Sequence, residues 1–136
     1  MFVNFSNHPS SNWSEEQRKE AQVFGKILDI PFPAIPAMAT TAEVVSMAEY
    51  WTEKIQRIRP ECIMCQGEFT FTMAVIWRLQ KEGIRCVTAC TERIAAEEPV
   101  RDGIVEKTSA FKFLQFREYE KMGIYLEVNN GSEQEV

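Results

Sequence analysis

The residues with the clearest chemical potential lie in a polar turn just after the apolar N-terminal stretch of the chain. His8 is the only histidine in the protein, and an imidazole takes or gives a proton near neutral pH. Its neighbours carry hydroxyl and amide groups that suit phosphate oxygens: Ser6, Asn7, Ser10 and Ser11. Ser, Asn and Pro are also ordinary turn formers, and a single histidine in a turn is more often a hydrogen-bonded polar group than a catalyst. Both interpretations of this turn stay open.

Two further polar clusters follow apolar stretches later in the chain. The first contains Gln66, Gly67, Glu68 and Thr70, and the second contains Thr91 and Arg93. Gly67 would let the backbone approach a ligand closely. Arg93 would hold a phosphate with two hydrogen bonds, unless it forms a surface ion pair. Glu68 would orient His8 or act as a base, although a carboxylate at a helix start also simply favours the helix dipole.

Strands and helices alternate along the first two thirds of the chain and must position these clusters. Short apolar runs predict strands at 2–5, 27–30, 61–65 and 85–90. Apolar residues spaced three and four apart predict helices at 16–26, 40–59 and 68–82. Capping boxes begin at Ser14 and Thr40; in the first, the Gln17 side chain is expected to reach back to Ser14.

The last third of the chain has a different pattern. Two strands are expected at 104–107 and 111–117, joined by a turn at Thr108-Ser109, while 97–99 and 102–103 are expected to be loop. A last strand is expected at 124–128, and 129–136 is an acidic tail that we expect to be flexible. The whole predicts one domain over 1–128: a three-layer, Rossmann-like α/β fold with an open, mostly parallel sheet and an antiparallel C-terminal edge.

This fold turns three separate clusters into one expected site. In an open parallel sheet, ligands bind outside the carboxyl ends of the strands, where the strand order reverses. Each polar cluster follows a strand that is apolar almost to its end. Hydroxyls, amides and the free N–H groups of helix starts at this edge would together form a surface for phosphate oxygens.

Composition narrows the class of protein. The net charge of −5 argues against a surface that coats DNA or RNA. No apolar run is long enough to cross a membrane and the first residues do not resemble a leader, so we expect a cytoplasmic protein. Cys62 and Cys65 have metal-type spacing, but they fall within a strand, where residues three apart face opposite sides. We therefore expect buried, reduced thiols and no metal.

Several cofactor motifs do not occur in the sequence: the nucleophile elbow, the phosphate-binding Walker loop, the dinucleotide glycine fingerprint and the His-Glu metal motif. We expect no cofactor.

The N-terminal stretch resembles a known family. Asn-Phe-Ser-Asn-His-Pro at 4–9, followed by Trp-Ser-Glu-Glu-Gln at 13–17, is similar to small stand-alone CRISPR-associated proteins of the Rossmann-like kind. These are compact relatives of CRISPR-associated Rossmann-fold (CARF) sensors, some of which are ring nucleases. The resemblance is sharpest over 2–17 and looser at 66–68 and 91–93. One departure is that the three polar clusters contain no lysine.

The resemblance implies a homodimer that binds a cyclic oligoadenylate across its two-fold axis. Cleavage would need no metal, because the protein would hold a ribose 2′-hydroxyl in line with its own phosphate. On this hypothesis the catalytic residues are His8, Ser11 and Glu68. The ligand-binding residues are Ser6, Asn7, Ser10, Gln66, Gly67, Thr70, Thr91 and Arg93.

Three rival interpretations remain. The same site could sense or sequester a cyclic nucleotide without cleaving it. The protein could instead process nucleosides or nucleotides with Glu68 as its key carboxylate. Finally, Trp51, Trp77 and the 111–116 strand could form a purely structural or partner-binding surface.

Overall fold

The computed structural model describes residues 1–101 and 103–122. Strands and helices alternate as the sequence predicts. In chain order the elements are β1 (Phe2–Ser6), the short 3-10 helix η1 (Ser10–Asn12), α1 (Glu15–Gln22), β2 (Ile27–Pro31), α2 (Thr41–Ile58), β3 (Cys62–Cys65), α3 (Phe69–Lys81), β4 (Arg85–Arg101) and β5 (Ile104–Glu118). The expected strand at 124–128 and the expected tail at 129–136 lie outside the described residues.

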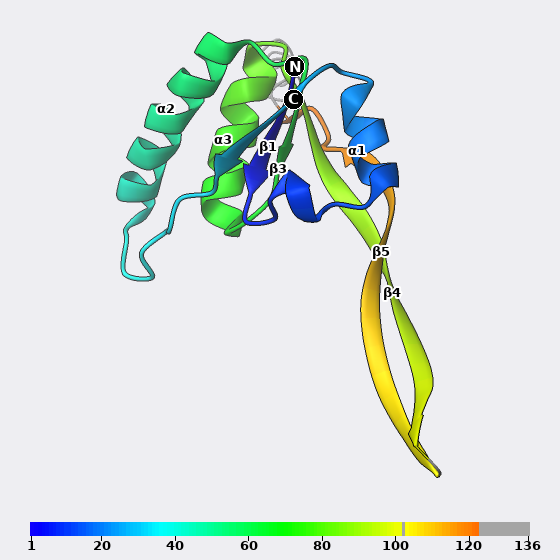
Figure 1. The fold of residues 1–136 in the computed structure, drawn as a ribbon. Helices are drawn as coiled ribbons and strands as arrows, with labels where there is room; N and C mark the ends of the chain where they lie inside the picture. The colour runs from blue at the N-terminus through cyan, green and yellow to red at the C-terminus, as the bar shows by residue number, and fades with distance from the viewer. Residues whose placement is uncertain (102, 123–136) are drawn as a thin grey trace, which may run out of the picture.

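The five strands form one sheet in the order β2-β1-β3-β4-β5. The first four run parallel, and β5 pairs antiparallel with β4 at the edge. Figure 1 shows α2 and α3 on one face of the sheet and α1 on the other, which makes three layers. The predicted Rossmann-like α/β fold is therefore confirmed.

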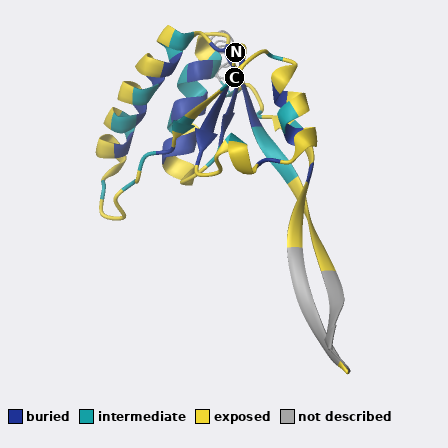
Figure 2. Ribbon diagram, in the orientation of Figure 1, coloured by how far each residue is buried: buried dark blue, intermediate teal, exposed yellow. Residues whose placement is uncertain are grey.

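Each face of the sheet has its own core, because successive strand residues point to opposite sides. Val3 and Phe5 of β1 pack with α2 and α3, whereas Phe2 packs with Trp13 and α1. Cys62 and Cys65 likewise belong to opposite cores, as their place in a strand predicts. Figure 2 shows how burial concentrates in the central strands and the inward sides of the helices.

The helix starts follow the predicted caps with one difference. The Ser14 hydroxyl accepts from the Gln17 N–H at 3.2 Å, and Thr40 caps α2 in the same way through the Glu43 N–H. The expected return contact from the Gln17 side chain is wrong. That side chain turns inward, and its Nε2 lies 3.9 Å from the Met64 sulfur. Burial of the inner face of α1 takes precedence over the second half of the capping box.

The largest departure from the sequence prediction is the C-terminal hairpin. Strands β4 and β5 pair without a break from Thr91↔Phe113 to Pro99↔Val105, so the expected loop at 97–99 is strand. The expected turn at Thr108-Ser109 is also wrong, because both residues pair with β4. The reversal occurs between Arg101 and Ile104, where Gly103 has a φ of +74°. Asp-Gly is a strong hairpin signal, and here it outweighs the charged residues and proline before it.

The hairpin extends far from the body of the protein. Strand β3 pairs with β4 only over Arg85–Val87, so beyond this point β4 has β5 as its strand neighbour. Figure 1 shows the two strands leaving the domain as a twisted ribbon. Within residues 1–101 and 103–122, no helix is long and apolar enough to span a bilayer.

Candidate functional site

The turn after β1 is fixed through the backbone of His8. The His8 carbonyl accepts from Asn4 Nδ2 at 2.8 Å and from Trp13 Nε1 at 3.1 Å. The His8 N–H donates to Ser6 Oγ at 3.1 Å. The side chain of His8 remains exposed, so the turn holds the imidazole at the protein surface from a rigid main chain.

Two residues outside the predicted site, Asn4 and Asp29, hold this turn. Asn4, only 1% exposed within β1, accepts from Ser6 Oγ at 2.7 Å and donates to Asp29 Oδ1 at 3.0 Å. The Asp29 carboxylate in turn accepts from both the N–H and the hydroxyl of Ser10. The hydroxyls of Ser6 and Ser10, predicted to bind ligand, are thus used within the protein. The signal for Asn4 was a lone amide inside an otherwise apolar strand.

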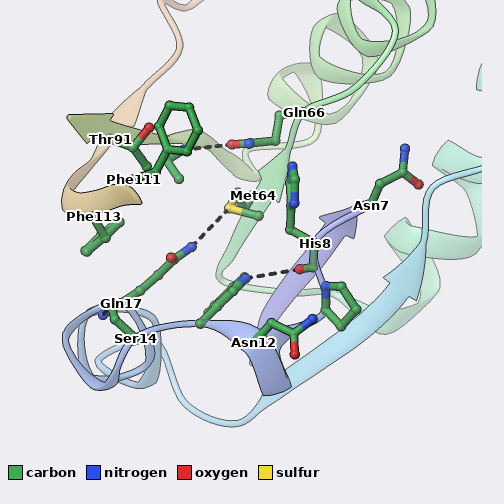
Figure 3. Close-up of a pocket in the computed structure, with 13 residues that line it drawn as sticks. Asn7, His8, Asn12, Ser14, Gln17, Met64, Gln66, Thr91, Phe111 and Phe113 are labelled. Carbon is green, nitrogen blue, oxygen red and sulfur yellow. Dashed lines mark hydrogen bonds between the residues drawn. The ribbon is translucent and has the colours of Figure 1, made fainter. Parts of the chain in front are cut away.

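A pocket of about 480 Å³ lies at the carboxyl ends of β1 and β3 and beside Ala89 and Thr91 of β4, on the α1 side of the sheet. Figure 3 shows side chains from α1, from the turn after β1 and from the start of the hairpin converging on it. Its lining residues are Asn7, His8, Pro9, Asn12, Trp13, Ser14, Gln17, Met64, Gln66, Ala89, Thr91, Phe111 and Phe113.

Four of the predicted site residues come together here: Asn7, His8, Gln66 and Thr91. Gln66 is held firmly, since its Oε1 accepts from the Ala89 N–H at 2.8 Å and from Thr88 Oγ1 at 3.0 Å. The ends of β1 and β3 therefore share one edge, as expected. The expected end of the fourth strand at residue 90 is wrong, because β4 runs on to Arg101 and Thr91 lies within it. The roles of these four residues toward a ligand stay predictions.

Glu68 is engaged elsewhere. Its carboxylate caps α3, accepting from the Phe71 N–H at 2.8 Å and from both the N–H and the hydroxyl of Thr70. The Phe71 N–H above all, and then Thr70, keep the pKa of Glu68 below its ordinary value. Of the two sequence interpretations, this geometry matches the helix-start carboxylate. Thr70 is part of the same cap.

Gly67 faces the apolar core rather than the pocket. A Cβ placed on it would lie 2.4 Å from Cζ of Phe32, far inside ordinary contact distance. The close approach that requires glycine here is that of the Phe32 ring.

The remaining two predicted residues lie near the pocket without lining it. Ser11 is exposed in η1. Arg93 pairs in register with Phe111, so it lies beside the mouth of the pocket on the neighbouring strand.

One family model matches residues 1–117, which is most of the chain and includes every residue of the pocket. The chain belongs to the Uncharacterized protein MJ1673 family. No curated protein and no solved structure matches the chain. The description of the MJ1673 family states no activity, so the resemblance to CARF-related proteins remains a prediction.

The pocket of this MJ1673-family chain is uncharged. None of its described lining residues is Asp, Glu, Lys or Arg, and His8 contributes an imidazole ring. Four amides and three aromatic rings provide hydrogen-bonding groups and flat apolar surface: Asn7, Asn12, Gln17 and Gln66, with Trp13, Phe111 and Phe113. Such a lining suits a planar, polar, uncharged ring more than an exposed phosphate.

The aromatic wall and Gln17 were missed from the sequence as site residues. Phe111 and Phe113 are two apart in β5 and therefore point to the same side. Their alternation was visible, but which side faced the pocket depends on the register of β5 against β4. Among residues 1–101 and 103–122, no three His, Cys, Asp or Glu side chains gather as metal ligands would.

Proposed function

We propose that this protein binds a cyclic oligoadenylate as a homodimer and cleaves it without a metal. The observation that carries the proposal is the position and lining of the pocket. It opens beside β1 and β3, where the strand order reverses, and that is the ligand site of open α/β sheets.

The chemistry of the lining supports a nucleotide ligand. Aromatic rings and amides bind bases by stacking and by edge hydrogen bonds. A volume of about 480 Å³ is in the range of sites for molecules of nucleotide size. Because a ring of several adenylates exceeds one such pocket, two copies related by a two-fold axis would each take part of it.

His8 is the residue through which cleavage would run. Attack of a ribose 2′-oxygen on its adjacent phosphorus forms a 2′,3′-cyclic phosphate and breaks the bond to the 5′-oxygen. The 2′-hydroxyl loses a proton, and the departing 5′-oxygen takes one up. A neutral imidazole accepts the first proton and an imidazolium supplies the second, and the fixed main chain of His8 places this group.

A non-catalytic sensor or sponge is the second candidate. It is favoured by one observation: of the three residues assigned to catalysis, only His8 lines the pocket. The nucleoside-processing alternative that relies on Glu68 loses support, since that carboxylate caps α3.

The test compares binding and turnover in the same samples. Wild-type protein, His8→Ala and the exposed α2 control Arg57→Ala are incubated with cyclic tri-, tetra- and hexa-adenylate. Melting temperature reports binding, and chromatography reports linear products. We expect one ring size to raise the melting temperature of all three proteins, with products lost only in His8→Ala.

Two results would contradict this proposal in different ways. A shift without products from wild type would make the protein a sensor or sponge. No shift with any cyclic oligoadenylate would refute the proposed ligand.

A further inference from the structure

The side chain of Gln17 is mostly buried, and its amide has a single weak hydrogen bond within the described residues. Gln17 is 8% exposed and lines the pocket, and within the described residues its side-chain amide has one hydrogen bond, the 3.9 Å contact from Nε2 to the Met64 sulfur. A thioether is a weak acceptor, and buried amides normally have full hydrogen-bonding partners. Figure 3 shows the Gln17 side chain reaching from α1 toward Met64 across the pocket. The amide is thus positioned for a partner that enters this space.

Phe111 presents the opposite situation, a large apolar ring in water. It is 71% exposed although it lines the pocket, whereas Phe113, two residues along β5, is 6% exposed. An exposed ring beside a pocket of amides is the arrangement on which proteins stack bases. Phe113 closes the adjacent wall through its contact with Phe116, at 4.9 Å between ring centroids.

We propose that Gln17, Phe111 and Phe113 form a base subsite that selects adenine. The ring of the base stacks on Phe111 while its hydrogen-bonding edge meets the amide of Gln17. The base subsite would bind any adenine nucleotide. Only the claim that the natural ligand is cyclic rests on the proposed function.

The choice of adenine follows from the hydrogen-bonding groups. An amide offers one donor and one acceptor side by side, which matches the N6 donor and the neighbouring ring-nitrogen acceptor of adenine. The Hoogsteen edge of guanine offers two acceptors and is typically read by Arg or Lys. Neither residue type is among the described lining residues.

The positions of the lining side chains set the direction of the ligand. Gln17 and the two phenylalanine rings come from α1 and β5, whereas His8 and Gln66 follow the ends of β1 and β3. The base therefore lies toward α1 and β5, and the ribose and phosphate lie toward His8 and Gln66. This orientation brings the phosphate to the imidazole.

The experiment measures affinities by calorimetry for adenosine 5′-monophosphate, guanosine 5′-monophosphate and ribose 5-phosphate. Gln17→Met keeps the length and packing of the side chain and removes the amide. Phe111→Ala removes an exposed ring, and Leu114→Ala is its matched control, since Leu114 is 54% exposed on the same strand and does not line the pocket.

We expect wild type to bind the adenine nucleotide at least tenfold more tightly than the other two probes. Gln17→Met should bring the adenine and guanine nucleotides to similar affinity. Phe111→Ala should weaken the adenine nucleotide by about 5- to 100-fold without changing ribose 5-phosphate. Leu114→Ala should behave as wild type.

The base subsite is overturned if wild type does not prefer the adenine nucleotide, or if both pocket variants bind it as tightly as wild type does. The same variants separate this inference from the proposed function. If cyclic oligoadenylates bind all variants equally, the ligand stands and the subsite fails. If no variant binds a cyclic oligoadenylate, but the preference for adenosine 5′-monophosphate depends on Gln17 and Phe111, the subsite stands and the proposed function fails.

Discussion

Replacing Gly67 with alanine tests whether this glycine makes room for the Phe32 ring or for a ligand. The new Cβ would lie 2.4–2.7 Å from three atoms of the Phe32 ring, and carbon atoms normally rest about 3.5–4.0 Å apart, so one group must move by about 1 Å. Phe32 cannot yield freely, because its ring centroid lies 5.3 Å from that of Phe5 and 5.2 Å from that of Phe71. Overpacking of this kind costs about 1–3 kcal/mol. For a chain of this size that lowers the melting temperature by about 3–10 °C.

Urea unfolding followed by tryptophan fluorescence and circular dichroism measures the loss. Phe32→Leu provides the control, because a smaller side chain makes room for the new methyl group. The double variant should be less destabilised than the sum of the two single variants, with a coupling of about 1 kcal/mol. The reasoning is refuted if Gly67→Ala unfolds at the wild-type urea concentration, or if the two effects simply add. Unchanged stability with weakened ligand binding would restore the sequence interpretation, in which this glycine admits a ligand.

Two further predictions concern the helix cap and the buried thiols. Glu68→Ala should lower the urea midpoint at pH 7. The folded-state pKa of Glu68 lies below its ordinary value, so its contribution to stability is present at neutral pH and is lost as the pH falls through the folded-state pKa. Variant and wild type should therefore converge in acid, and a difference that does not shrink with falling pH would contradict the cap. Burial raises the pKa of the Cys62 and Cys86 thiols from 9.0 to about 12, so at pH 8 Ellman's reagent should react quickly with the partly exposed Cys90 alone, and with all four cysteines after denaturation. The stability that these protonated thiols confer is complete below pH 9 and declines toward pH 12, and rapid reaction of Cys62 or Cys86 in the folded protein would be inconsistent with their burial.

Local patterns were sufficient for most of the fold. Apolar runs placed β1 to β3 within a residue or two, and the hydroxyls of Ser14 and Thr40 marked two helix starts. The helix expected at 16–26 ends early, at Gln22, because the chain turns at Gly25 with a φ of +108°. These features depend on neighbours a few residues away, which is the range over which sequence patterns carry information.

The sequence prediction for the hairpin is wrong because two local signals conflict. Charged residues and a proline at 97–99 looked like a loop, while Asp102-Gly103 carried the real turn signal. Pairing along the whole length of β4 and β5 outweighs the poor strand propensity of single residues. Glu97, for example, is part of β4 and pairs with Lys107 of β5.

The site was predictable in position and incomplete in composition. The rule about strand ends located Asn7, His8 and Gln66 at one pocket, and Thr91 joins them from within β4. The pocket wall made by Gln17, Phe111 and Phe113 comes from the inner side of α1 and from β5, and it exists only once the helix has packed and the register of β5 is set. Gln17 could not be found locally, because its capping-box position suggested a different use of the side chain.

The irregularity at the root of the hairpin has a mechanical consequence. Cys90 pairs with Gln115 but Thr91 pairs with Phe113, so the register slips by one residue where the ribbon leaves the sheet, and a bulge of this kind increases local twist. Thr91 and Phe113 also belong to the pocket wall, so the hairpin bends away from the sheet at the pocket. The β4 arm from Thr91 to Arg101 is roughly 35 Å long, so a rotation of about 10° at the bulge carries its far end by about 6 Å. A change of twist at this bulge would therefore move the tip of the hairpin farther than it moves the pocket residues Thr91 and Phe113.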